Sequence, residues 1–299
     1  MPDSSGKSWS PVPRRLPPPA TSEVTVLTGR NEEQPAALRT GAVIFPLDRR
    51  AARRGATVGA EVAMTARLLD ILPVGPTVVI VVSPVVAIDP LVGEVVNAAC
   101  RMLGPDAGPT ATLTVGVACP HPVPPGSAGG TSMYNQHLDA LPEAVLESIA
   151  VARRCGVTTD AGACVLLMQR FAPPTASAVV YASPDRTRPV RIDGRWGLTE
   201  ANPTDAASDT FLVPADATAG MQERLAWKPT ASLTAPGGTR TVRLPVSWRY
   251  RYSLSRNTVR QLAGLAREAA AAVGRPLSLD VAMFADAPVV LRCRPCLPA

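Results

Sequence analysis

Three amphipathic helices, separated by short β-branched runs, are the feature that most constrains the fold of this chain. The first helix is expected over residues 89–104, the second over 142–154, and the third between Ser255 and Gly274. Each carries one apolar face, which must be covered by another element. The strands between the helices supply that surface, so the alternation predicts an α+β or α/β fold.

The expected strands are short runs rich in valine, isoleucine and leucine. They cover 78–82, 113–117, 165–168, 178–181 and 190–192, and a final hairpin pairs 277–284 with 288–294. We expect two lobes, over residues 23–160 and 161–299, with the change between 155 and 165. Residues 1–22 are rich in proline and arginine and are expected to form a disordered tail.

The charge of the chain comes almost wholly from arginine. The net charge is +6 over 299 residues, yet Lys7 and Lys228 are the only lysines. Arginines gather at 49–54 and again at 186–195, but no aromatic residues interleave with them there. Both clusters are typical of solvated faces, and we expect no nucleic-acid partner.

No segment of the sequence predicts a membrane span or a secreted disulfide scaffold. The longest apolar stretch, residues 77–88, is interrupted by Ser83 and Pro84 and is shorter than a spanning helix. The tail lacks the apolar core of a secretory signal. Six scattered cysteines, including the pair Cys293 and Cys296, favour reduced thiols. These features predict a cytoplasmic protein.

Four short motifs in the second half of the chain occur in a familiar order. They are Met168-Gln169-Arg170-Phe171, Ala176-Ser177-Ala178-Val179, Gly197-Leu198-Thr199-Glu200 and Asp209-Thr210-Phe211-Leu212-Val213. The closing hairpin from Gly274 to Pro295 follows them. In order and spacing these segments resemble the nucleotide-binding domain of the phosphoenolpyruvate synthase and pyruvate phosphate dikinase family.

Two segments of the first half extend this resemblance. Thr28-Gly29-Arg30, followed by Ala36-Ala37-Leu38, is similar to the first phosphate-binding turn and helix of the family. Ser132-Met133-Tyr134-Asn135-Gln136 is similar to its loop over the phosphates. The resemblance implies an ATP-grasp-like fold, in which two lobes hold ATP and Mg²⁺ between them.

The resemblance also implies roles for individual residues. Arg30, Gln169, Glu200 and Arg294 occupy nucleotide-binding positions, whereas Ser132, Asn135 and Gln136 lie in the phosphate loop. Asp280 stands at a metal-binding position of the hairpin. The phosphohistidine and phosphoenolpyruvate domains of the family are not in this sequence, so a full reaction would need a separate protein that carries them.

Several of these positions have changed in chemistry. Arg292 replaces a glutamine that ligates metal in the family, and a cation cannot ligate another cation. If the hairpin turns at Asp286, Asp280 and Arg292 lie opposite each other, and we expect an ion pair where the metal would lie. Asn135 replaces a loop glycine, and Asp139 places a negative charge near the expected phosphates.

Two functions remain open at this point. One is an ATP-binding domain of kinase or phosphotransferase type that supplies phosphoryl groups to a partner. The alternative is a degenerate, non-catalytic ATP-grasp relative that acts as a binding or regulatory subunit. The first predicts Mg²⁺-dependent ATP binding, and the second predicts a cleft that is closed by its own ion pairs.

Overall fold

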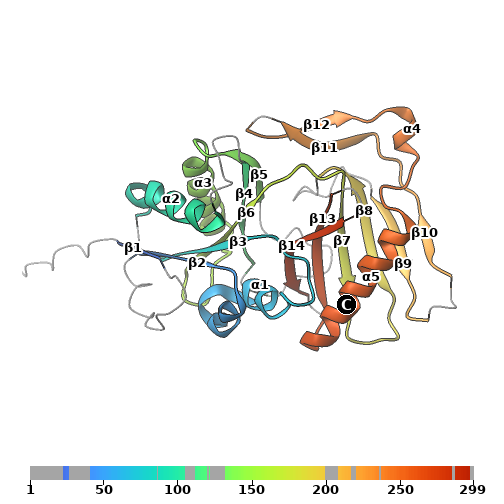
Figure 1. Ribbon diagram of the computed structural model, residues 1–299, viewed down its shortest axis with the longest axis horizontal. Helices are drawn as coiled ribbons and strands as arrows, with labels where there is room; N and C mark the ends of the chain where they lie inside the picture. Colours follow the sequence, from blue (N-terminus) through green and yellow to red (C-terminus); the bar gives the residue numbers. More distant parts are fainter. Residues whose placement is uncertain are drawn as a thin grey trace, which may run out of the picture.

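The computed structural model contains two six-stranded sheets, and each packs against helices (Figure 1). It describes residues 23–26, 41–85, 87–104, 112–119, 121, 132–198, 208–216, 220–235, 237–284 and 287–296. The fold is α+β, as the pattern of helices and strands predicts. None of the helices in this described part is long and apolar enough to cross a membrane.

The first sheet has the strand order β1-β2-β3-β6-β4-β5. Its strands are β1 (Glu23–Val26), β2 (Gly41–Pro46), β3 (Thr77–Val82), β4 (Thr112–Val117), β5 (Ser132–His137) and β6 (Cys164–Arg170). Only β1 and β2 are paired in parallel. Since β6 belongs to this sheet and β7 to the other, the chain passes from the first sheet to the second after Arg170.

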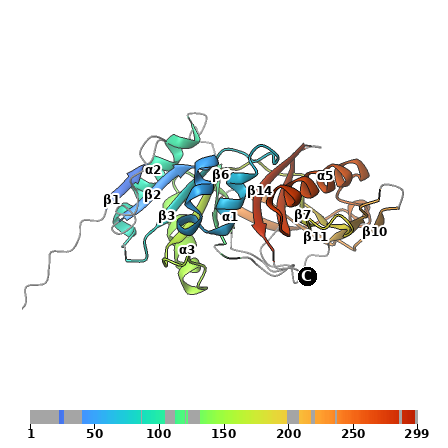
Figure 2. The same ribbon diagram turned by 90° about the horizontal axis from the view of Figure 1, so that it is seen from below.

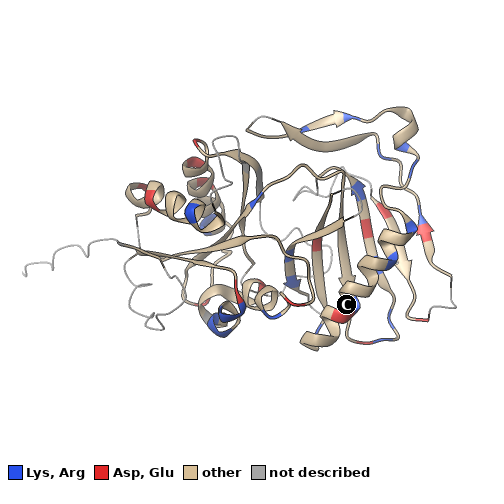
Figure 3. Ribbon diagram, viewed as in Figure 1, with Lys and Arg blue, Asp and Glu red and all other residues tan. Residues whose placement is uncertain are grey.

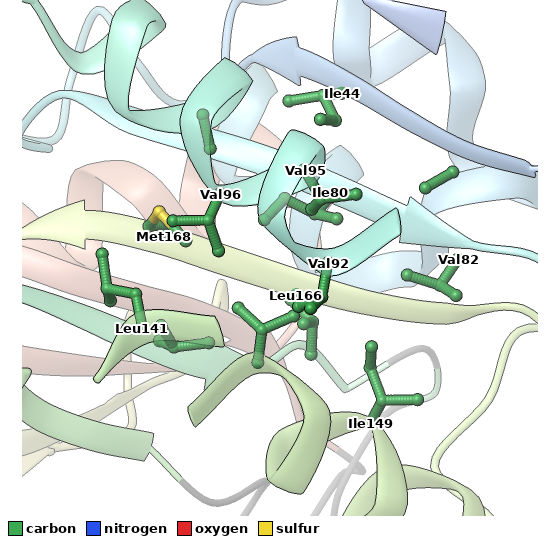
Figure 4. Packing of buried hydrophobic residues seen from close by; sticks show 14 of the residues in the cluster. Ile44, Ile80, Val82, Val92, Val95, Val96, Leu141, Ile149, Leu166 and Met168 are labelled. Atoms are coloured by element: carbon green, nitrogen blue, oxygen red, sulfur yellow. The ribbon is translucent and has the colours of Figure 1, made fainter. Parts of the chain in front are cut away.

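Helices cover both faces of the first sheet, which explains why its central strands are apolar throughout. All six residues of β3 are buried. On one face lie α2 (Val92–Leu103), preceded by a short 3-10 turn over Asp89–Leu91, and α3 (Leu141–Arg154). Figure 4 shows Ile80 and Leu166 packed beneath these two helices. The other face is covered by α1 (Gly55–Arg67) and the 3-10 helix Arg49–Arg54.

The second sheet has the order β10-β9-β8-β7-β13-β14 and is antiparallel. It contains β7 (Ala176–Ala182), β8 (Val190–Trp196), β9 (Asp209–Val213), β10 (Gln222–Arg224), β13 (Leu277–Phe284) and β14 (Ala287–Pro295). Helix α5 (Arg256–Val273) packs on one face. The hydroxyl of Ser255 accepts a hydrogen bond from Thr258 N–H at its start, and Gly274 ends it in the left-handed conformation, as predicted.

Helix α1 joins the two lobes. Val58 and Val62 pack on the first sheet, whereas Met64 and Leu68 belong to the core beneath α5. Figure 2 shows α1 between the first sheet and β14. The helix is broken at Gly59, which has φ 77° and ψ 170°, a conformation open essentially to glycine alone. This break brings the next turn of α1 against the end of β4.

A two-stranded hairpin extends from the second lobe toward the first (Figure 1). It consists of β11 (Thr230–Ala235) and β12 (Gly238–Arg243) and leads into the short helix α4 (Val246–Arg249). Its tip contacts β5, and its first strand touches the second sheet through a bridge between Gly197 and Ser232. The sequence pattern predicted neither this hairpin nor α4.

Candidate functional site

The candidate site lies where the end of β4, the start of the resumed α1 and the strand β14 meet. Glu61 follows the break at Gly59, and both its backbone and its side chain form hydrogen bonds with the backbone of Cys119. Its N–H donates to the carbonyl of Cys119 at 3.3 Å, and its Oε2 accepts from the N–H of Cys119 at 2.6 Å. Glu61 is fully buried, so its carboxylate requires a cationic partner.

Arg292 on β14 is that partner. Its Nε donates to Glu61 Oε1 at 2.7 Å, and its Nη2 donates to Glu61 Oε2 at 3.2 Å and to the carbonyl of Val117. The side chain of Arg292 is only 6% exposed. This buried, bidentate ion pair therefore links the first lobe to the second, and its two parallel hydrogen bonds fix the orientation of both side chains.

The prediction of an ion pair between Asp280 and Arg292 is wrong, although the predicted pairing of the two strand positions is confirmed. The two residues are Cα partners across the terminal hairpin. However, Asp280 binds the guanidinium of Arg294, its diagonal neighbour on the same face. Arg292 turns instead to Glu61, because a fully buried carboxylate would otherwise lack compensation. Glu61 had not been considered, since it lies far from the hairpin in sequence.

Gln169 lies at the same junction and holds it closed. Its side-chain amide donates to Thr77 Oγ1 at 2.9 Å and to the carbonyl of Leu291 at 3.1 Å. It thereby links β6 and β3 of the first sheet to β14 of the second. Its neighbourhood encloses a cavity of about 10 Å³, room for about one water molecule. That cavity is lined by Thr114, Gly116, Ser132, Leu167, Gln169, Leu291 and Arg292.

The residues predicted for a phosphate loop lie instead on strand β5, and two of them contact the hairpin tip. Asn135 has φ 56°, the sole positive φ at a residue other than glycine in the described chain. Its amide donates to the carbonyl of Ala235 and, at 3.3 Å, to that of Gly238. Gln136 donates to the carbonyl of Gly237 at 3.4 Å. Asn135, which replaces a glycine of the resembled family, therefore adopts the left-handed conformation, and its side chain holds the hairpin tip against β5.

The remaining predicted site residues fall into two groups. Arg30 and Glu200 lie outside the described residues, so the structure does not relate them to the junction. Ser132 lines the small cavity, and Arg294 and Asp280 lie next to Arg292 on the same face of β13 and β14. The structure thus gathers Gln169, Ser132 and Arg292 at one junction, with Arg294 close by.

The donors at this junction do not fit a magnesium ion. Asp280 forms an ion pair with Arg294, and the residue opposite Asp280 on the neighbouring strand is Arg292. Mg²⁺ requires oxygen ligands in near-octahedral geometry, and cations in their place repel it. Within the described ranges, no three His, Cys, Asp or Glu side chains form a group that could hold a metal.

Two thiols at the junction, those of Cys119 and Cys293, have raised pKa values and low nucleophilic reactivity. Burial, reinforced by the nearby Glu61 carboxylate, raises the pKa of the Cys119 thiol to about 11. Burial also raises the pKa of Cys293, next to Arg292. Cys293 and Cys296 are both buried and unbridged, as the sequence predicts. Because the thiolate is the nucleophilic form, neither Cys119 nor Cys293 is poised for attack.

A larger groove of about 390 Å³ lies elsewhere, over the outer face of the second sheet. It is lined by Arg191, Thr210, Leu212, Gln222, Glu223 and Arg224. Arg191 is held there by Asp193 at 3.0 Å. The groove is shallow and contains none of the residues predicted for the nucleotide site.

Comparison with known proteins does not assign this two-lobed α+β chain to a family. No family model matches it, and no curated protein matches it. Among solved structures it is similar to D-alanine–D-alanine ligase from Bacillus anthracis, with a TM-score of 0.36 and 8% sequence identity. The match covers 80% of this chain and 57% of the ligase, so the chain spans little more than half of that protein. A TM-score this low assigns neither a fold family nor a function.

Proposed function

We propose that this chain is a degenerate, non-catalytic relative of ATP-grasp nucleotide-binding domains that acts as a binding or regulatory subunit. The observation that carries the proposal is the buried pair between Glu61 and Arg292. It occupies the junction at which the resemblance to phosphoenolpyruvate synthase expects metal and phosphate. A guanidinium at this place removes a metal ligand and adds a positive charge that repels the ion.

The small volume of the cavity between Gln169 and Arg292 supports the same proposal. Pockets for ligands of nucleotide size measure about 300–1,000 Å³, whereas the cavity at Gln169 and Arg292 measures about 10 Å³. Nucleotide entry would require the two lobes to separate and Glu61 to lose its partner. Leaving a buried charge unpaired costs about 3–5 kcal/mol, which lowers apparent affinity by about two to four orders of magnitude.

A second candidate is an ATP-binding domain of phosphotransferase type that works with a protein carrying the phosphohistidine or acceptor domains. One observation favours it. Arg294 is 6% exposed, and its Nε is buried without a hydrogen-bond partner in the described part of the chain. A buried donor of this kind is costly unless something accepts from it. A phosphate oxygen is one suitable acceptor, provided that Asp280 releases the guanidinium.

Calorimetric titration with ATP, with and without Mg²⁺, separates the two candidates. We expect no saturable heat from the wild-type protein up to millimolar ATP. The double variant Glu61→Gln, Arg292→Gln removes both buried charges and supplies an amide oxygen where the resemblance expects a metal ligand. Gain of Mg²⁺-dependent binding in this variant would support a nucleotide site that has been lost by substitution.

The opposite outcome is equally specific. Mg²⁺-enhanced binding of ATP to the wild-type chain, abolished by Arg294→Ala, would overturn the degenerate role and establish the phosphotransferase-type candidate. Circular dichroism and thermal unfolding of the Arg294→Ala protein serve as the control that the loss reflects the site. Arg49→Ala, a change at an exposed arginine on the first lobe, provides the matched variant that should leave any binding unchanged.

A further inference from the structure

Exposed apolar side chains gather at the base of the β11–β12 hairpin and on α4. Nine large hydrophobic residues are exposed in the described chain, and seven of them fall between residues 225 and 252. Within this group of seven, the most exposed are Val246 at 65% and Tyr250 at 62%. A contiguous apolar patch on a folded protein marks an interaction site, whereas scattered single residues do not.

The aromatic residues of the patch are held in a defined arrangement. The rings of Trp227 and Tyr250 are 4.6 Å apart and tilted by 46°, and those of Trp196 and Trp248 are 4.5 Å apart and tilted by 50°. The guanidinium of Arg249 lies over the Trp227 ring at 5.5 Å. The chain contains only four tryptophans in total, so three of them in this one region is a strong concentration.

The same region is strongly basic, although Arg256 at the start of α5 is paired with Glu223. The segment from Arg224 to Arg267, both included, contains nine lysine and arginine residues and no aspartate or glutamate. Figure 3 shows basic residues along the hairpin and α4 and no acidic residue on either. One of the nine, Lys228, is buried against Asp209. The exposed charges around the rings are therefore those of the arginines, among them Arg243, Arg249 and Arg251.

The base of this surface is rigid. Asp209 is fully buried, and its carboxylate accepts hydrogen bonds from Lys228 Nζ, from Ala226 N–H at 3.0 Å, and from Ser253 N–H and Oγ at 2.8 and 2.9 Å. These contacts hold the two ends of the segment that carries the rings. A preformed surface loses little conformational entropy when it binds.

We propose that the arginine–aromatic surface, formed by Trp227, Val246, Trp248, Arg249, Tyr250 and Arg251, binds a partner protein through a segment rich in both acidic and apolar residues. Tryptophan, tyrosine and arginine are the residues that most often dominate protein–protein binding energy. Charge complementarity requires acidic groups on the partner, because this surface presents none. The proposal deepens the binding role proposed above and rests on it.

A protein partner fits the surface better than single-stranded nucleic acid. Stacking of bases requires free ring faces, but here the rings are turned toward one another and Arg249 covers a face of Trp227. The exposed aliphatic groups of Val246 and Leu225 offer contact area to apolar side chains. Nucleic acid is therefore retained only as an outcome that the test must distinguish.

The test uses a fluorescein-labelled peptide with repeated Glu-Asp-Leu-Phe units and measures anisotropy on titration with the full chain. Two matched peptides replace the acids by Gln and Asn, or the apolar residues by Ser and Gly. We expect saturable binding of the first peptide below about 1 mM and at least about tenfold weaker binding of both controls. The double variant Tyr250→Ala, Arg251→Glu should weaken binding by at least about tenfold, whereas Arg101→Glu on α2 should not.

Three results would overturn the proposal. They are absence of saturable binding, equal binding of the uncharged peptide, and tighter binding of oligo-dT or oligo-rU than of the acidic peptide. The ATP titration is a separate measurement, so a failure of the peptide experiment leaves the state of the nucleotide site to be judged by itself. Unchanged thermal unfolding of the double variant shows that a lost signal reflects the surface and not the fold.

Discussion

The two lobes use their sheets differently. The first sheet is covered by helices on both faces, and its central strand β3 is buried at every position. The second sheet is covered by α5 on one face, and its strand β9 alternates between buried and partly exposed residues. The first sheet is therefore buried on both faces, whereas the second sheet presents polar side chains along the face opposite α5. The junction residues Arg292, Asp280 and Arg294 all lie on that polar face.

The largest expected effect comes from removing the ion pair between Glu61 and Arg292, which links the two lobes. Arg292→Met should destabilise the protein by about 3–5 kcal/mol, because it leaves Glu61 buried without a partner. Denaturation in urea, followed by fluorescence, measures the change. The double variant Glu61→Met, Arg292→Met should recover most of the loss, since an apolar pair of similar volume can replace a buried ion pair. A loss that persists in the double variant would mean that the guanidinium bond to Val117 dominates.

A matched pair of substitutions tests the contrast between the sheets directly. Val79 lies on the face of β3 beneath α1, and Val179 lies on the half-buried face of β7. Val79→Thr buries a hydroxyl and should cost about 1–3 kcal/mol. Val179→Thr should change stability by less than about 0.5 kcal/mol. Equal losses at the two positions would contradict the one-sided burial of the second sheet.

The contact between β5 and the hairpin tip should have a smaller, local effect. Asn135→Ala removes the side-chain bonds to Ala235 and Gly238 and keeps the unfavourable positive φ, so we expect a loss of about 1–2 kcal/mol. Asn135→Gly removes the same bonds but adopts this φ freely, and should cost less. Hydrogen exchange over residues 230–243 reports the loosening. Unaltered exchange in both variants would show that the hairpin is held from its base alone.

The smallest expected effect is the change of folding stability with pH that results from the raised pKa of Cys119. Its folded pKa is raised to about 11 from an ordinary value near 9, so the folded chain retains the proton longer than the unfolded chain. This contribution to stability is complete below pH 9 and is lost as the pH rises toward 11. In iodoacetamide labelling at pH 8, the exposed Cys155 should react first and Cys119 should be protected. Labelling of Cys119 as fast as Cys155 would indicate that the junction opens readily.

Much of the element pattern could be predicted, because it depends on local periodicity and capping. The three helices and the terminal hairpin were confirmed, and so was the pairing of Asp280 with Arg292 along the strands. The hairpin β11–β12 was missed because it is largely exposed and lacks alternating apolar residues. The arginine–aromatic surface had a visible signal in Trp248-Arg249-Tyr250-Arg251-Tyr252, in which aromatic and basic residues do interleave.

The candidate site shows where sequence reasoning ended. Glu61 was overlooked, although a single acidic residue among the small apolar residues 55–66 is typical of a buried charge that needs a partner. Its partner is 231 residues away. Local sequence determined that Glu61 and Arg292 are charged, that Gly59 can break a helix, and that β14 is a strand. Only the tertiary structure decided which charges meet, because desolvation penalises every arrangement that leaves one of them buried alone.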